Sequence, residues 1–205
     1  MKSPPARDQE PDSGVTLCLS CGLCCQGVLH DHATLEPQDA ELAGRLNLPV
    51  YTHETGRHVF SLPCPCYRDD RCSVFPNRPT VCGAYRCHVL DRHGRGELSL
   101  DEAMGLAKQG RELISSLYHH MDEAPDGSRS IWQQTEAFQA RQRSAMGPAG
   151  FARAHTEFLR NLTRLVGLVR REFLPRSGQE GPSTPGSRMA PPPGSARSAG
   201  RRSSS

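Results

Sequence analysis

The chain has 205 residues, of which 36% are hydrophobic and only 5% aromatic. This composition excludes a large hydrophobic core, because so little apolar surface barely offsets the entropy lost on folding. The formal net charge is +3, and no stretch interleaves basic with aromatic residues, so we predict no nucleic-acid binding.

Residues 1–14 are polar and rich in proline, and we expect them to be disordered. They lack the apolar segment of a secretory signal, and no later apolar run is long enough to span a membrane. We therefore expect a cytoplasmic protein with no membrane partner. In a reducing compartment clustered cysteines bind metal or perform redox chemistry more often than they form lasting disulfides. A disulfide scaffold is the alternative, and the odd number of cysteines, nine, counts against it.

Four of the nine cysteines stand within eight residues, at Cys18, Cys21, Cys24 and Cys25. Two residues between cysteines allow a tight turn to direct both sulfurs inward, and Gly22 can take the positive φ that such a turn needs. The repeated interval matches the first part of a ferredoxin-type cluster pattern. Because adjacent side chains diverge, we expect Cys25 to face a second site or to be a spare thiol.

Two short elements are predicted between the cysteine groups. Thr34, with Pro37 in the first turn and leucines on one side, predicts a helix over residues 34–46. Residues 58–62 alternate in polarity and predict a brief strand that delivers the chain to Cys64.

The remaining cysteines, Cys64, Cys66, Cys72, Cys82 and Cys87, complete a cysteine-rich domain over residues 15–98. A proline follows Cys64, as in the remote fourth ligand of the ferredoxin-type pattern. Eight thiols suit two four-sulfur sites or one polynuclear site. His30, His32 and His88 could each ligate if one sulfur is not used, although a hydrogen-bonded histidine is the commoner outcome. Arg78 is expected to bond loop carbonyls or to balance thiolate charge.

Residues 99–174 are predicted to form a helical region. Ser99 and Glu102 have capping-box spacing ahead of apolar residues at helical intervals that reach Met121. A break at residues 125–127 precedes a second helix over about 130–145, and a third begins near Pro148 and stops at Pro175. These helices carry no catalytic constellation. Residues 175–205, rich in Ser, Pro, Gly and Arg, are expected to be a disordered tail.

The cysteine blocks resemble the zinc- or iron-chelating CxxCxxCC family, also called YkgJ-type cysteine-cluster proteins. Cys18-x-x-Cys21-Gly-x-Cys24-Cys25 matches the opening signature, Cys64-Pro the middle cysteine, and the run from Cys72 to Cys87 the closing block. The resemblance covers about residues 16–90 and suggests a bacterial origin. It implies metal ligation by eight cysteines: Cys18, Cys21, Cys24, Cys25, Cys64, Cys72, Cys82 and Cys87.

This sequence departs from the family pattern at two positions. Cys66 stands where the family has an apolar residue, which leaves open which thiol of the Cys64 and Cys66 pair ligates. Gly83 replaces an arginine that commonly follows the cysteine at 82, and Arg86 could supply the missing cation.

We therefore expect a small irregular α(+β) cysteine-cluster metal-binding domain, followed by α-helical segments and flanked by disordered termini. The expected function is binding of zinc or iron, with an iron–sulfur cluster as one form, in a structural or electron-transfer role. Two alternatives stay open. One relative is a flagellin lysine methylase said to carry an iron–sulfur centre, so one alternative is a protein-modifying enzyme, although no cofactor loop or catalytic group is visible. The other is a thiol redox sensor or metal store. A metal ion is the predicted partner, and the sequence identifies no protein partner.

Overall fold

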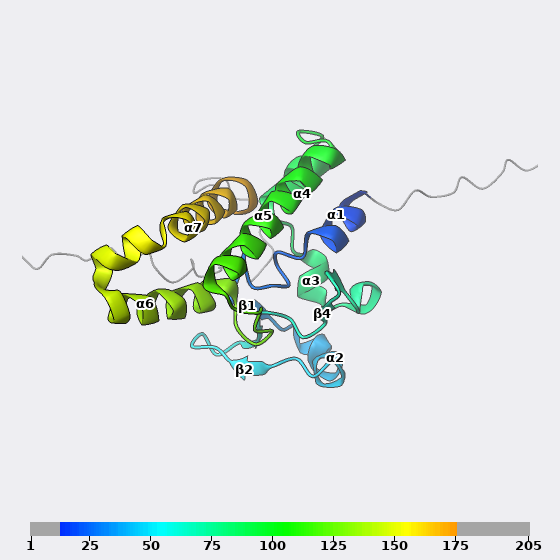
Figure 1. The fold of residues 1–205 in the computed structure, drawn as a ribbon. Coiled ribbons are helices and arrows are strands. Elements are labelled where there is room, and N and C mark those ends of the chain that lie inside the picture. Colours follow the sequence, from blue (N-terminus) through cyan, green and yellow to red (C-terminus); the bar gives the residue numbers. More distant parts are fainter. Residues whose placement is uncertain (1–12, 176–205) are drawn as a thin grey trace, which may run out of the picture.

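The structure is a computed structural model that describes residues 13–175. Most of the described chain is helical, with two small sheets (Figure 1), in agreement with the expected α(+β) class. The predicted disordered termini lie outside the described residues, except that Ser13 and Gly14 belong to the first helix and Pro175 ends the described chain. Within residues 13–175, none of the helices combines the length and apolar character needed to cross a bilayer.

The first third of the chain forms helix α1 (Ser13–Cys21) and a three-stranded antiparallel sheet with strand order β1-β3-β2. The predicted strand over residues 58–62 is confirmed as β3. The predicted helix over residues 34–46 is shorter than expected, because Thr34 pairs with Val59 and the amide of Leu35 donates to the His58 carbonyl at 2.9 Å. Because Thr34 and Leu35 pair with β3, the helical segment begins only at Pro37. The elements are β1 (His32–Thr34), the 3-10 turn η1 (Pro37–Asp39), α2 (Ala40–Arg45), β2 (Val50–Thr52) and β3 (His58–Ser61).

The closing cysteine block is built from short pieces that need outside support. Buried Asp39 provides it: its carboxylate accepts hydrogen bonds from the Thr80 amide at 2.7 Å and the Thr80 hydroxyl at 3.1 Å. This holds the first turn of the helix that carries Cys82. The pieces are β4 (Tyr67–Arg68), β5 (Arg71–Cys72), the 3-10 turn η2 (Phe75–Asn77), α3 (Thr80–Ala84) and α4 (His88–Gly94).

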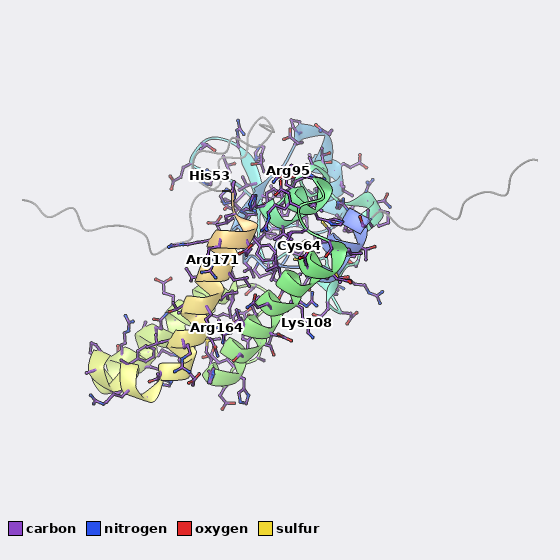
Figure 2. The ribbon with its side chains drawn as sticks, turned by 90° about the horizontal axis from the view of Figure 1, so that it is seen from above. His53, Cys64, Arg95, Lys108, Arg164 and Arg171 are labelled. Atoms are coloured by element: carbon purple, nitrogen blue, oxygen red, sulfur yellow. The ribbon has the colours of Figure 1, made fainter. Side chains whose placement is uncertain are left out.

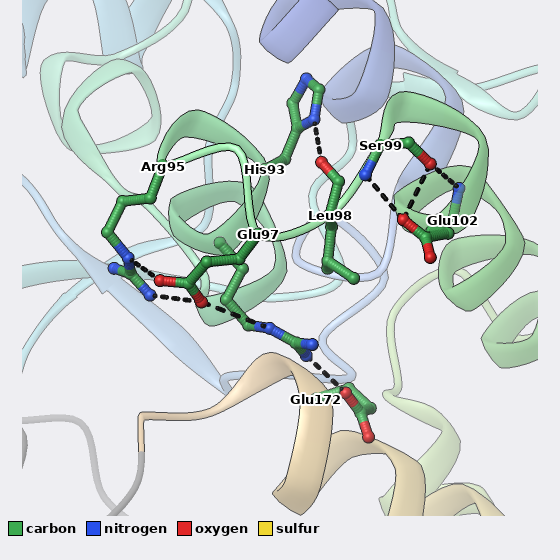
Figure 3. Close-up of polar contacts among 8 residues, drawn as sticks. His93, Arg95, Glu97, Leu98, Ser99, Glu102 and Glu172 are labelled. Carbon is green, nitrogen blue, oxygen red and sulfur yellow. Dashed lines mark hydrogen bonds and ion pairs between the residues drawn. The ribbon is translucent and has the colours of Figure 1, made fainter.

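The helical region follows the sequence pattern closely at its start. Helix α5 (Leu100–Met121) begins with the predicted capping box, in which Ser99 and Glu102 bond each other's backbone amides (Figure 3). Helix α6 (Ile131–Ala154) has a kink at Gly147, where φ is 71°, at the predicted boundary between two helices. A further break at His155, which the sequence pattern did not predict, separates α7 (Thr156–Leu168), and the π-helical turn η3 (Val169–Phe173) ends the fold.

Two separate hydrophobic clusters organise these elements. The larger packs helices α4 to α7 and η3 against Leu17 of α1 and against Leu23, which lies in the first cysteine loop, residues 22–31 between α1 and β1. This cluster therefore runs across the expected boundary between residues 98 and 99. The smaller lies under the three-stranded sheet and is built from Ala43, Leu48, Phe60, Leu62 and Cys66. An ion pair of 2.8 Å between Arg92 and Glu172 ties α4 to η3 in the larger cluster.

Two glycines of α5 provide a test of how closely this helix packs on the first cysteine loop. Gly105 is exposed with open space around it, and a Cβ at buried Gly110 would lie 3.0 Å from the Leu23 side chain. Glycine costs about 1 kcal/mol relative to alanine inside a helix. We therefore expect Gly105→Ala to raise the free energy of unfolding by about 1 kcal/mol, and Gly110→Ala to give less than this gain or a net loss. Urea unfolding followed by circular dichroism measures both, and equal gains would show that α5 does not pack tightly on Leu23.

Candidate metal centre

All nine cysteines line one cavity of about 520 Å³. The larger hydrophobic cluster borders it through Cys21, Cys24 and Cys87, and the smaller cluster borders it through Cys64 and Cys66. The cavity therefore lies between the two clusters. Figure 2 shows Cys64 towards the centre of the molecule, behind the helices.

The first group of sulfurs consists of Cys18, Cys21, Cys24 and Cys87. Cys18 and Cys21 share a face of α1 because they are three residues apart on a helix, where the cysteine spacing predicted a tight turn. The chain then reverses at Gly22, whose φ of 69° is the predicted left-handed conformation. Cys24 lies within electrostatic range of Cys87, Cys21 and Cys18, and also of its neighbour Cys25. Cys87 is the N-cap of α4, and its sulfur accepts a hydrogen bond from the Leu90 amide at 3.5 Å.

The second group consists of Cys25, Cys64, Cys72 and Cys82. Cys25 lies within electrostatic range of the other three and also of Cys21, and its carbonyl accepts a hydrogen bond from the Cys64 amide at 2.7 Å. Cys24 and Cys25 thus face largely different cysteines, although each also lies near a cysteine of the other set. The two sets meet at this dipeptide and line one cavity.

Cys66 is the ninth thiol, and it lies beside the second group. It is buried, its side chain hydrogen-bonds to Cys64, and it is also close to Cys82. The second group therefore has five neighbouring thiols, and the structure leaves either member of the Cys64 and Cys66 pair able to serve.

Burial makes these thiols hard to ionise. It is the largest cause that raises the pKa of Cys21 to about 11, of Cys87 to about 12 and of Cys24 well above the ordinary 9.0. Neighbouring cysteines raise each pKa further, because several thiolates in one place repel each other. Without a bound cation, the thiols of Cys21, Cys24 and Cys87 are protonated at neutral pH.

Two arginines lie close enough to the sulfurs to offset negative charge. Arg78 lowers the pKa of Cys82, against a larger rise from burial, and donates to the Phe75 carbonyl at 3.2 Å, so both predicted roles of Arg78 are confirmed. Arg111 of α5 donates to the Ser20 carbonyl at the end of α1 and lowers the pKa of Cys21. No sequence pattern predicts this role for Arg111, because Arg111 and Ser20 are 91 positions apart in the chain.

Arg86 also lines the cavity, but its side chain is engaged by α4. Its guanidinium pairs with Asp91 at 2.6 Å and donates to the Leu90 carbonyl at 3.3 Å. That Arg86 supplies the cation missing at Gly83 stays a prediction.

The three candidate histidines differ in position. His30 lines the cavity, is only 9% exposed, and neither ring nitrogen has a hydrogen-bond partner. Burial lowers the pKa of His30 to about 4, so the ring is neutral at pH 7 and packs edge-on against Tyr85 with ring centroids 4.7 Å apart. His32 also lines the cavity. His88 is not among the lining residues that the structure describes.

The donor set fits a metal centre bound by thiolates. Buried polar atoms without partners, such as the His30 nitrogens, are rare unless a water, ion or ligand satisfies them. Thiolates are the usual ligands of zinc and of iron–sulfur clusters. Within residues 13–175, however, no three His, Cys, Asp or Glu side chains are placed to hold a single ion as they stand.

A family model matches residues 17–105, and its description reads "Putative zinc- or iron-chelating domain" of the CxxCxxCC type. The match includes all nine cysteines and ends within α5. No curated protein and no solved structure matches the chain.

Gly22 has a second role besides its backbone conformation. A Cβ at this position would overlap the ring and hydroxyl of Tyr67, which lies over the loop and accepts a hydrogen bond from Gln26 at 3.3 Å. Gly56 also has a positive φ, of 76°, but has open space around it. The two glycines therefore separate backbone strain from the Tyr67 contact.

We expect Gly56→Ala to lower the free energy of unfolding by about 1–2 kcal/mol, the cost of a left-handed non-glycine residue. Gly22→Ala should cost more and should also reduce the metal content, because Tyr67 must move off the cysteine loop. Thermal unfolding and elemental analysis of both variants measure this difference. Equal destabilisation with unchanged metal content would show that Tyr67 does not constrain the loop.

Proposed function

Since residues 17–105 belong to the CxxCxxCC family, we propose that this domain binds metal through two groups of four cysteine thiolates. The first group is Cys18, Cys21, Cys24 and Cys87, and the second is Cys25, Cys64, Cys72 and Cys82. The observation that carries the proposal is that all nine thiols line one cavity, in which Cys24 faces mainly Cys87 and Cys21 while Cys25 faces mainly Cys64, Cys72 and Cys82. Four thiolates are a complete ligand set for one tetrahedral zinc ion or one cubane cluster.

The cavity has room for iron–sulfur clusters as well as for single zinc ions. Four sulfurs bound to one zinc ion lie about 3.8 Å apart, because each Zn–S bond is about 2.3 Å long and the geometry is tetrahedral. In a cubane each cysteine binds a different iron, so the sulfurs stand further apart. All nine thiols line a cavity of about 520 Å³, which is large enough for the wider arrangement.

We propose an electron-carrying role for this centre. Iron–sulfur clusters exchange single electrons, at potentials set by net charge, hydrogen bonds to sulfur and exposure. The chain supplies each of these: Arg78 and Arg111 bring positive charge, the Leu90 amide donates to the Cys87 sulfur, and Cys18 and Cys82 are exposed. One exposed cysteine in each group gives a redox partner an approach to both.

The first test is to isolate the full chain without oxygen and to quantify iron, zinc and acid-labile sulfide per chain. We expect a brown protein that contains iron and sulfide in similar amounts. Cys21→Ser and Cys82→Ser should each remove about half of the iron, because each change affects one group. Cys66→Ser is the matched control and should keep all of it if Cys64 is the ligand.

Three results would contradict the proposal in different ways. A colourless, zinc-loaded protein would replace the clusters with structural zinc. Complete loss of metal from either single variant would exclude two independent groups. A folded protein without transition metal would exclude metal binding as the function.

The second test concerns pH. Without metal, the thiols of Cys21 and Cys87 are protonated below pH 9, since burial holds the pKa of Cys21 near 11 and that of Cys87 near 12. Binding must therefore displace protons, and lowering the pH favours the metal-free form. Affinity should fall by up to about four orders of magnitude per pH unit for each four-thiolate group. Competition with a chelator between pH 6 and 8, corrected for protonation of the chelator, measures this, and a flat profile would exclude thiolate ligands.

A further inference from the structure

His30 is a polar side chain of the sulfur cavity that the two proposed ligand sets do not use. The residue is 9% exposed and lines the cavity, and neither of its ring nitrogens has a hydrogen-bond partner. His32 also lines the cavity but differs, because its Nδ1 lies 2.6 Å from a carboxylate oxygen of Asp31. Since a buried polar group without a partner is rare unless a ligand, ion or water satisfies it, the ring of His30 points to a bound group.

The backbone on both sides of His30 is anchored. The Trp132 indole donates to the Val28 carbonyl at 2.9 Å, two residues before the histidine. The Leu62 amide donates to the Asp31 carbonyl at 2.9 Å, one residue after it. These contacts come from α6 and from the end of β3, so the fold holds this short segment against the cavity.

Tyr85 connects the His30 ring to the first group of sulfurs. The two rings meet edge to face, with centroids 4.7 Å apart and an angle of 90° between their planes. Tyr85 also lies within electrostatic range of Cys24 and Cys87. The described residues that line the cavity include all nine cysteines but no carboxylate and no side-chain amide. Sulfur is therefore the most abundant side-chain acceptor that the cavity offers to a ring N–H.

We propose that His30 donates a ring N–H to a sulfur of the bound metal centre, on the side of Cys24 and Cys87. This inference rests on the proposed function. It does not depend on the charge of the ring, because neutral and protonated imidazole both carry at least one N–H. His30 is a hydrogen-bond donor and not a ligand, since eight cysteines already supply two complete sets of four thiolates.

Such a donor affects the redox potential. Hydrogen bonds to sulfur are among the features that set the reduction potential of an iron–sulfur cluster. The reduced cluster carries one more negative charge than the oxidised one, so an N–H stabilises the reduced form more. Loss of the His30 donor should therefore lower the midpoint potential without removing iron.

The helical region contains a matched control. Nε2 of His155 is also buried without a partner, and its ring packs against Phe138 and Phe151 with centroids 5.1 Å and 5.0 Å away. His155 is not among the described residues that line the cavity. Its loss should leave the metal centre unchanged.

The experiment uses the full chain with ¹⁵N-labelled histidine, isolated without oxygen and then reduced. Hyperfine spectroscopy of the paramagnetic cluster gives a weak ¹⁵N coupling for an N–H that donates to sulfur and a strong one for a nitrogen bound to iron. We expect a weak coupling that His30→Leu removes and His155→Leu retains. His30→Leu should also lower the ratio of reduced to oxidised cluster about tenfold at a fixed potential, which is about 59 mV for one electron. His155→Leu should keep the wild-type potential.

The inference is overturned if the wild type shows no weak coupling, or if His30→Leu keeps the coupling or the potential. A strong coupling that disappears in His30→Leu would make His30 a ligand and would also overturn it. His30→Gln is closer to histidine in polarity and removes the same label, so it replaces His30→Leu if that variant fails to fold.

Iron and sulfide content tests the proposed function separately. Loaded protein without the weak coupling contradicts only the role of His30, whereas folded protein without metal contradicts the metal centre itself. In a colourless, zinc-loaded protein the same hydrogen bond should give a slowly exchanging ring N–H proton of His30 in NMR spectra, and its absence would overturn the inference there.

Discussion

The whole structure depends on the burial of thiols between two hydrophobic clusters that are each too small to hold this chain alone. The larger cluster borders Cys21, Cys24 and Cys87, the smaller borders Cys64 and Cys66, and the two sets of sulfurs meet at Cys24 and Cys25. Protonated thiols in this place form only weak hydrogen bonds. Ionised thiols here would repel one another, and this repulsion contributes to the raised pKa values of Cys21 and Cys24. A bound cation turns that repulsion into attraction, so metal binding and folding of residues 17–105 are coupled in energy.

The first cysteine loop is the part on which this coupling acts. Four contacts fix the position of this loop. Gly22 reverses the chain under Tyr67, and Leu23 packs against Gly110 of α5. Arg111 of α5 donates to a carbonyl at the end of α1, and the Trp132 indole of α6 donates to the Val28 carbonyl at 2.9 Å. Three of these supports come from α5 and α6. The helical region therefore orients the sulfurs although it contributes none of them. This explains why the larger hydrophobic cluster crosses the expected boundary between the two parts of the chain.

The parts of the fold that the sequence predicted correctly depend on local sequence signals. The capping box at Ser99, the break before α6, the strand before Cys64 and the positive φ of Gly22 each depend on residues within a few positions of one another. Long-range contacts decided the rest. Pairing of Thr34 with Val59 shortened the predicted helix, and α1 replaced a tight turn at Cys18 because Leu17 is buried in the larger cluster. The number of cysteines suited two four-sulfur sites or one polynuclear site, and only the fold shows that Cys87 lies near sulfurs more than sixty residues away.

The position of Cys66 connects this assignment to reactivity. A fifth thiol in hydrogen-bond contact with Cys64 gives the second group an alternative donor at one coordination position. The extra thiol nearest the first group is Cys25, which is itself surrounded mainly by Cys64, Cys72 and Cys82. A ligand that another thiol can displace leaves more easily than one that must dissociate first, since the metal never loses a bond without gaining one. In the proposed centre the second group would therefore exchange a ligand through Cys66, the one cysteine that departs from the family pattern.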